Sequence, residues 1–285
     1  MNAAADSRLP PLRAGDWLLA GALAFGFAPS LLALAKAWWE TDYLSHGPLV
    51  PLVAWAIAAT GSAERRALPP SPDRRGFVAI GGAVVASLLG GLTGSVSLQG
   101  LGVVGAVAGG VWLRRGSAWL RSLAFPLAFL LVAVPPPPEW VTPLLLELQL
   151  GVSSAVVEIG YWVGIPVLRE GNVLQIPGGA LEVANACSGV TSLFTLSAIA
   201  LALAALSLER WPARLLLVAW SIPAALLGNL VRVLATVALA SQLGVERATE
   251  GGLHTLLGLS TYVVAVGLLL LGDALLRRGE RRASA

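Results

Sequence analysis

The sequence contains few of the residues on which soluble enzymes and metalloproteins depend. Of its 285 residues only 12 % are charged, one is cysteine and two are histidine. A single cysteine cannot form an internal disulfide bond, so its thiol has to be explained in another way. His46 and His254 have neither the two-histidine nor the His-Glu spacing of a metal site, which argues against a metal-dependent intramembrane protease. We therefore expect no bound metal and no cofactor.

Hydrophobic residues take the place of the missing polar ones. They make up 56 % of the sequence, which also contains 32 glycines. This composition is typical of a membrane protein with several spans and excludes most soluble folds. The formal net charge is only +3, and the basic residues, nearly all of them arginine, occur in short clusters between apolar runs. The clusters are therefore topology signals, and no nucleic-acid partner is expected.

Eight apolar runs approach the roughly 20 residues that a membrane span requires. We expect an all-α integral membrane protein of about eight transmembrane helices, with residues 1–285 forming a single polytopic domain in contact with lipid. The first run is too long for a signal-peptide core and is expected to be an uncleaved anchor. Glycine pairs such as Gly81-Gly82 and Gly109-Gly110 are expected to allow close helix packing. The runs are 17–34, 49–60, 77–92, 98–113, 119–134, 193–206, 215–234 and 253–271.

Arginine clusters indicate the orientation of the chain. With eight spans, the main clusters all fall on one side of the membrane, whereas the opposite loops are mostly acidic. The positive-inside rule makes the arginine-rich side, and with it both termini, cytoplasmic. We expect a multi-pass protein of the inner (plasma) membrane. The clusters are Arg8 and Arg13, Arg65 and Arg66, Arg74 and Arg75, Arg114, Arg115 and Arg121, Arg210 and Arg214, and Arg277, Arg278, Arg281 and Arg282.

Residues 135–186 are expected to form a small cap on the outer face. The segment 139–164 is apolar enough for a further span, but a full crossing would move the C-terminal arginines outside. A helix would align residues 147, 151, 154 and 158, including Glu147 and Glu158, on one polar stripe. An amphipathic helix that lies in the outer interface, or re-enters it, therefore fits better. The two glutamates are expected either to form a solvated face or to line a substrate entrance.

The rest of the cap contains short β-prone runs that are separated by Glu170-Gly171-Asn172 and Pro177-Gly178-Gly179. This pattern predicts small β-turns with short strands, and their polar backbone has to lie outside lipid. The chain then enters the stretch 181–190, which holds Cys187 where polar sequence gives way to a long apolar run. The only thiol of the chain is therefore expected at the membrane surface.

Two further polar residues are expected at the depth of Cys187. From Cys187 the chain descends for about 20 residues and then climbs for about 18 to Arg232, which corresponds to roughly 30 Å and 27 Å of helix. His254 begins the last predicted helix at the same level. Residues of about 187–271 therefore form the candidate catalytic helices, and the three side chains meet on the extracytoplasmic face.

Cysteine, histidine and arginine together provide what acyl transfer through a thiol requires. A thiolate attacks a peptide carbonyl, an imidazole moves protons, and a fixed cation stabilises the oxyanion. Asn229 lies one helical turn before Arg232 and is able to orient the guanidinium or to donate to the oxyanion. Each residue alone has a simpler explanation, namely a packed thiol, an arginine that snorkels to the interface or a histidine cap. Only their common depth favours catalysis.

At these residues the sequence resembles the exosortase/archaeosortase family of polytopic membrane cysteine proteases and transpeptidases. The similarity lies in ordered motifs at residues 166–172 (PVLREGN), 181–189 (LEVANACSG) and 229–232 (NLVR), followed by His254, with 43–51 (YLSHGPLVP) resembling an N-terminal motif. Val190-Thr191 stands where many members have Ile-Arg, and Thr255 stands where an aspartate is common. These departures leave the three candidate catalytic residues in place.

The resemblance implies a role for each matching residue. Cys187 would be the nucleophile, His254 the acid and base, and Arg232 the charged stabiliser. His46 matches a family position without an assigned role. As supporting or substrate-binding residues we include His46 together with Asn229, Glu182, Ser188, Glu147 and Glu158.

The implied substrates are exported proteins with a C-terminal sorting tail that consists of a short motif such as Pro-Glu-Pro, a transmembrane helix and an arginine-rich end. The enzyme would cleave the tail through a thioester and pass the acyl group to water or to an amine. A rival interpretation from another class is a transporter or a membrane component of exopolysaccharide export. In that case Arg232 would bind an anionic ligand and Cys187 would only pack.

Overall fold

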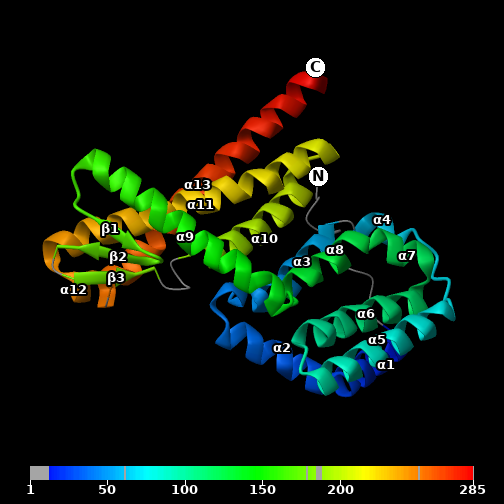
Figure 1. The fold of residues 1–285 in the computed structure, drawn as a ribbon. Coiled ribbons are helices and arrows are strands. Elements are labelled where there is room, and N and C mark those ends of the chain that lie inside the picture. The colour runs from blue at the N-terminus through cyan, green and yellow to red at the C-terminus, as the bar shows by residue number, and fades with distance from the viewer. Residues whose placement is uncertain (1–12, 61, 178, 184–187, 250, 285) are drawn as a thin grey trace. The chain divides into compact units, whose positions relative to one another are not determined.

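The computed structural model describes residues 13–60, 62–177, 179–183, 188–249 and 251–284, apart from the side chains of Ser62, Leu253, His254 and Ser284 (Figure 1). The chain forms two compact units, Met1–Pro137 (unit 1) and Pro138–Ala285 (unit 2). The single polytopic domain expected from the sequence stays a prediction.

In its described part, unit 1 consists of helices and their connections. They are α1 (Ala14–Gly26), α2 (Ala28–Glu40), the 3-10 helices η2 (Asp42–Leu44) and η3 (Gly47–Leu49), α3 (Val50–Thr60), α4 (Ser62–Arg66), α5 (Arg75–Thr93), α6 (Val96–Arg115), α7 (Ser117–Ser122), α8 (Ala124–Phe129) and the 3-10 helix η4 (Leu130–Ala133). The axes of α1 and α2 differ by 68°. Pro29 in the first turn of α2 has no N–H to donate to the preceding turn, which explains the break at Phe27.

Glycine allows α5 and α6 to form a closely packed hairpin. A Cβ atom at Gly102 would clash with Ser87 Oγ and lie 2.7 Å from the carbonyl oxygen of Ala83, and one at Gly109 would lie 2.8 Å from Ile80 Cγ1. Neither could be added without a shift of the neighbouring helix. Small residues are typical of helix contacts in membranes, where close packing holds helices together. The expectation was wrong for Gly81-Gly82, because Cβ atoms there would have no neighbour within 4 Å.

Hydrogen bonds between distant segments define two ends of unit 1. At the arginine-rich end, the backbone N–H of Ser71 donates to the carbonyl oxygen of Arg115 over 3.1 Å. At the opposite end, Trp38 Nε1 donates to the carbonyl oxygen of Ala133 over 2.7 Å. The segment from α7 to η4 therefore runs from the arginine-rich end of the unit to the opposite end. This is the direction expected for the fifth predicted span, 119–134, which begins within the cluster Arg114, Arg115 and Arg121.

The all-α membrane fold is as predicted, whereas the number of long spans is smaller than eight. Among the described residues, six helices are long and apolar enough to cross a membrane, and the bent pair α1–α2 makes up to seven. Two of the predicted spans are short. The run 49–60 becomes α3, which has 11 residues, and the run 119–134 is broken at Leu123 between α7 and α8.

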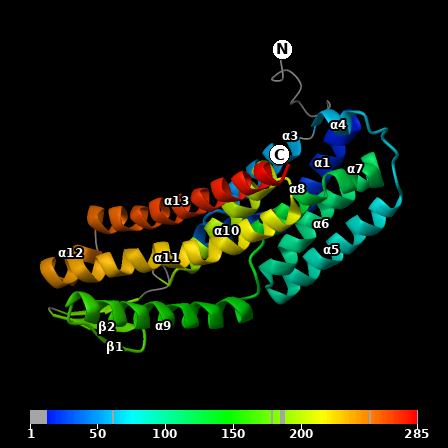
Figure 2. The same cartoon turned by 90° about the horizontal axis from the view of Figure 1, so that it is seen from above.

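Unit 2 combines four long helices with a small sheet. Its elements are α9 (Pro138–Val163), β1 (Leu168–Glu170), β2 (Val173–Ile176), β3 (Gly179–Glu182), α10 (Val190–Ser207), α11 (Trp211–Leu243), α12 (Val245–Thr249) and α13 (Gly251–Ser284). Figure 2 shows α10, α11 and α13 side by side. Leucine and alanine fill the core between them, among them the buried Leu196, Leu217 and Leu269.

The strands form an antiparallel sheet in the order β1-β2-β3, as the turn pattern predicts. β1 and β2 are joined by the two residues Gly171-Asn172, and Gly171 has a φ of 64°, which glycine adopts without strain. Leu174 and Leu181 of the sheet are buried in one cluster with Val156 of α9 and Val237 of α11. The sheet is thereby fixed to the part of α11 that follows Arg232.

Two helices are longer than the sequence suggests, and a third, α9, has the predicted length but differs from the expectation in another way. α9 has 26 residues and is, by length and composition, able to span a membrane, which the sequence argument excluded. α11 has 33 residues and α13 has 34, including the arginine-rich tail. Helix α12 occupies much of the loop expected between α11 and α13. Hydrophobic runs mark only the apolar part of a helix, and they do not show where the hydrogen-bonded helix ends.

Candidate active site

The residues directly after Cys187 determine how the chain enters α10. Cys187 itself lies outside the described residues. Ser188 is fully buried, and its Oγ accepts a hydrogen bond from the backbone N–H of Val190 over 3.2 Å. Gly189 caps the N-terminus of α10 with a φ of 88° and a ψ of −4°, in the left-handed region. Only glycine adopts this conformation without strain, so Gly189 allows the sharp entry into the helix just after the cysteine.

Asn229 of α11 packs directly against this entry. Its side chain is fully buried. A Cβ atom added to Gly189 would lie 3.2 Å from Asn229 Nδ2 and 3.3 Å from Asn229 Cγ. The amide therefore lies against the backbone two residues after Cys187. Asn229 and the motif that contains the cysteine are neighbours in the structure, although 40 residues separate them in the sequence.

Arg232 connects α11 with α13. A Cβ atom at Gly258 of α13 would lie 3.9 Å from both Cζ and Nη2 of Arg232, so the half-buried guanidinium lies over the backbone at Gly258. His254 is four residues earlier in α13, and residues four apart lie on the same face of a helix. The backbone position of His254 is therefore on the helix face that Arg232 contacts.

Close contact between α11 and α13 sets this register. A Cβ atom at Gly228 would lie 2.8 Å from the carbonyl oxygen of Thr261 and 2.9 Å from the Cβ of Ala265. The two helices approach here without an intervening side chain, one residue before Asn229 and one turn before Arg232. Gly228 thereby holds the polar side of α11 against the first half of α13.

The arrangement juxtaposes a guanidinium and an amide at the junction of the bundle and the sheet. Arginine carries five N–H donors and asparagine two, and all are suited to an oxyanion or a carbonyl. Among the described residues, no three His, Cys, Asp or Glu side chains lie close enough together to bind a metal ion.

The remaining predicted residues of unit 2 lie on its exterior. Glu182 of β3 is exposed and accepts a hydrogen bond from Asn172 Nδ2 over 3.4 Å, so it braces the sheet. Glu147 and Glu158 are exposed on α9, and Trp162 Nε1 donates to Glu158 over 3.3 Å. The polar stripe on α9 is confirmed, and both glutamates lie on an exposed face.

His46 belongs to unit 1 and has a structural environment there. It is only 7 % exposed, and its Nε2 lies 3.4 Å from the carbonyl oxygen of Val132. Burial lowers the pKa of His46 below its ordinary value of 6.5, and the hydrogen bonds to the backbone oppose this shift in part. His46 joins the start of α3 to η4. Its proposed part in substrate binding stays a prediction.

Sequence reasoning missed two polar clusters that contain aspartates. Asp273 of α13 is fully buried. It accepts a hydrogen bond from Ser207 Oγ over 2.5 Å and forms an ion pair with Arg277. Asp16 of α1 forms ion pairs with Arg114 and Arg115. Asp16 stands one residue before the run 17–34 and Asp273 two residues after the run 253–271. A carboxylate at the edge of an apolar run is the signal that would have marked both sites.

The family model of the transmembrane exosortases (Exosortase_EpsH) matches residues 38–271, which include Cys187, Arg232 and His254. No curated protein and no solved structure matches the chain.

Proposed function

Because the chain belongs to the transmembrane exosortase family, we propose that it is a membrane-embedded cysteine endopeptidase and transpeptidase. Its substrates are exported proteins with a C-terminal sorting tail, made of a short motif such as Pro-Glu-Pro, a transmembrane helix and an arginine-rich end. It cleaves the tail next to the motif and forms a thioester with the part of the substrate that precedes the cleaved bond.

The position of Arg232 is the observation that carries this proposal. Its guanidinium lies against Gly258, one helical turn from His254. One turn earlier on α11, Asn229 lies against Gly189, two residues after Cys187. Two contacts of α11 thus support a common location for the three candidate catalytic residues.

The proposed reaction has two steps. The thiolate of Cys187 attacks the scissile carbonyl, and the negative charge that develops on its oxygen is stabilised by the guanidinium of Arg232. The C–N bond then breaks, His254 donates a proton to the leaving amine, and a thioester remains on Cys187. Water or an amine attacks the thioester, His254 accepts its proton, and Cys187 is released as a thiolate beside the protonated imidazole, which is the starting state. The N-terminus of α10 favours negative charge nearby, which suits a thiolate.

Processing of a co-expressed reporter protein with such a tail tests the proposal. Cys187→Ala and Cys187→Ser should leave the reporter at full length, whereas the wild-type chain shortens it. Arg232→Lys should also fail, because an ammonium group cannot reproduce the planar fork of the guanidinium. Arg247→Lys on α12 is a matched control, since Arg247 is exposed, and it should process normally.

The outcome also separates the proposal from the rival function. Normal processing by both Cys187 variants would contradict a thioester mechanism and would favour a transporter or an export component with a packed cysteine. Normal processing by Arg232→Lys would show that only the charge at this position matters. Immunoblotting of membranes has to show equal amounts of each variant, so that failure to insert is not taken for loss of catalysis.

A further inference from the structure

Unit 1 contains a cavity that the proposed catalytic reaction does not use. It has a volume of about 350 Å³, is lined by α1, the start of α2 and α6, and is partly open at the surface of the unit. This volume is within the roughly 300–1,000 Å³ that is usual for small-molecule sites. Its walls are apolar over most of their length, with Leu23, Phe27 and Val107 among the lining residues. Only one group of lining residues is charged, namely Asp16, Arg114 and Arg115.

The cavity follows from the sequence of the helices around it. The 68° bend between α1 and α2 prevents both helices from following α6 along their whole length. Where they diverge, the facing side chains are small, and Ala20, Ala24, Ala106 and Gly110 line the space. No side chain from these positions is long enough to fill it.

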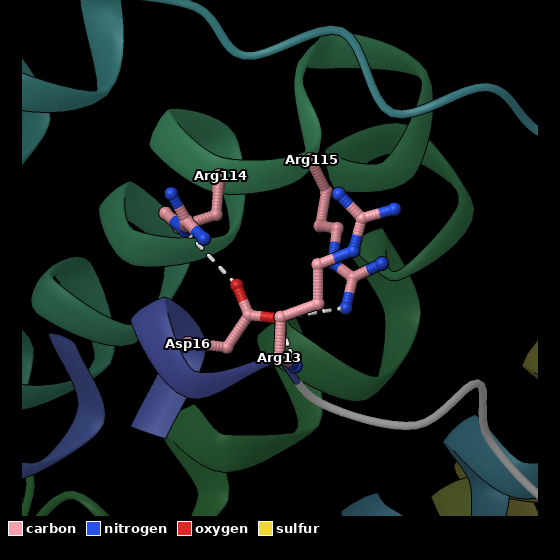
Figure 3. Close-up of polar contacts among 4 residues, drawn as sticks. All are labelled: Arg13, Asp16, Arg114 and Arg115. Atoms are coloured by element: carbon pink, nitrogen blue, oxygen red, sulfur yellow. Dashed lines mark hydrogen bonds and ion pairs between the residues drawn. The ribbon is translucent and has the colours of Figure 1, made fainter. Parts of the chain in front are cut away.

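The charged end of the cavity carries an excess of positive charge (Figure 3). Arg114 Nε donates to Asp16 Oδ1 over 2.9 Å and Arg115 Nη2 donates to Asp16 Oδ2 over 3.0 Å. Arg13 is drawn beside them, and its backbone N–H also donates to Asp16. One carboxylate thus pairs with two guanidinium groups, whereas Arg13 contributes only its backbone N–H. Each guanidinium has five N–H donors, which is more than one carboxylate can accept, so a further anion can be bound without displacing Asp16.

An apolar cavity that ends at an arginine pair matches the two parts of a phospholipid. We propose that this cavity binds one anionic phospholipid, with an acyl chain between α1 and α6 and the phosphate at Arg114 and Arg115. The side chain of Arg114 is 39 % exposed, so a headgroup can reach it. By the orientation that the arginines predict, this end of α6 faces the cytoplasm, where anionic lipids attract basic residues.

Other occupants fit the cavity less well. A transmembrane helix has a diameter of roughly 10 Å with its side chains. A helix of this diameter and of membrane-spanning length occupies far more space than the cavity offers. The arginine-rich end of the proposed substrate would be repelled by Arg114 and Arg115. An acyl chain gains little free energy on moving from bulk lipid into an apolar cavity. Selection should therefore come from the phosphate and should weaken at high salt.

Native mass spectrometry of the full-length protein, with added phosphatidylglycerol or phosphatidylcholine, tests this inference. The wild-type chain should retain one phosphatidylglycerol in preference to phosphatidylcholine. The double variant Arg114→Gln/Arg115→Gln should lose this retention by roughly tenfold or more, from two lost contacts to an anionic headgroup. Arg278→Gln/Arg282→Gln removes the same charge from exposed positions of α13 and should retain the lipid.

A second pair of variants keeps the charges and protects the test against misfolding. Ala24→Trp fills the cavity and should reduce retention of phosphatidylglycerol, whereas Ala22→Trp changes an exposed alanine of α1 that does not line the cavity and should have no effect. Equal retention of the two lipids by the wild-type chain would overturn the proposal, as would equal retention by the two tryptophan variants. Competition by inorganic phosphate alone would indicate a simple anion site and would also overturn it.

Discussion

Replacing Gly189, which contacts Asn229, allows two effects to be told apart. One is the loss of stability from backbone strain, and the other is the loss of processing from a displaced Asn229 in the candidate active site. Alanine at Gly189 would take a φ of 88°, which an L-residue adopts at a cost of about 1–2 kcal/mol. Its Cβ would also lie 3.2 Å from Asn229 Nδ2, so the buried amide would have to shift by a few tenths of an ångström. We expect Gly189→Ala both to lower stability and to reduce processing of the sorting-tail reporter.

Gly244 is the matched control for this variant. It has a φ of 89° and a ψ of 153°, a region that costs a non-glycine residue about 1–3 kcal/mol. A Cβ atom there would have no neighbour within 4 Å. Gly244→Ala should therefore be destabilised by an amount comparable to Gly189→Ala, yet it should process the reporter normally.

Thermal unfolding in detergent, followed by tryptophan fluorescence, measures the strain in both variants. A loss of 1 kcal/mol corresponds to a fall in Tm of about 2–4 °C for a chain of this size class. The processing assay is then run at a temperature where both variants are folded. Equal processing by the two variants would refute the idea that Asn229 has to be held in place beside the cysteine motif.

Three further predictions concern other parts of the chain. Burial lowers the pKa of His46, so the folded state favours the neutral imidazole. The free energy of unfolding should therefore be constant at pH values above the ordinary pKa of 6.5. As the pH falls below 6.5, it should decrease by at most about 1.4 kcal/mol per pH unit. His46→Gln should flatten this part of a Tm–pH curve, and an unchanged curve would contradict the assignment. Asp273→Ala should lower the free energy of unfolding by about 1–3 kcal/mol, because Ser207 and Arg277 lose a buried acceptor. Asp42 is exposed, so the control Asp42→Ala should change this free energy by less than about 0.5 kcal/mol. Similar losses in the two variants would argue against a structural role for Asp273. Gly258→Ala should process the reporter normally, since its Cβ would be in ordinary contact with Arg232 at 3.9 Å, but Gly258→Leu should displace the guanidinium and stop processing.

The sequence was a good guide wherever a pattern of polarity determines structure. Apolar runs predict the helices because a chain in lipid has to satisfy its own backbone hydrogen bonds. The turn at Gly171-Asn172 predicts the β1–β2 hairpin, since glycine there accepts a positive φ. The stripe through Glu147 and Glu158 predicts the exposed face of α9. Asn229 lies against Gly189 and Arg232 against Gly258, whereas the common depth of Cys187, Arg232 and His254 stays a prediction.

The sequence was a poor guide where structure depends on contacts between distant segments. Gly258 and Gly228 look like ordinary packing glycines, and only the approach of α11 to α13 shows that one lies under Arg232 and the other sets the register. Asp16 and Asp273 have partners 98 and 66 residues away, which no local pattern reveals. Helix ends were also missed, because α11 continues to Leu243, nine residues beyond the predicted run 215–234.

Intact-mass analysis of the purified protein, incubated with a synthetic sorting-tail peptide in lipid nanodiscs, tests the central claim most directly. The proposed mechanism predicts that the wild-type chain gains the mass of the peptide fragment that precedes the cleaved bond, that the adduct maps to Cys187, and that hydroxylamine removes it as it removes other thioesters. Arg232→Lys should show no adduct. Cleavage of the peptide by Cys187→Ala, or an adduct on any other residue, would contradict the mechanism.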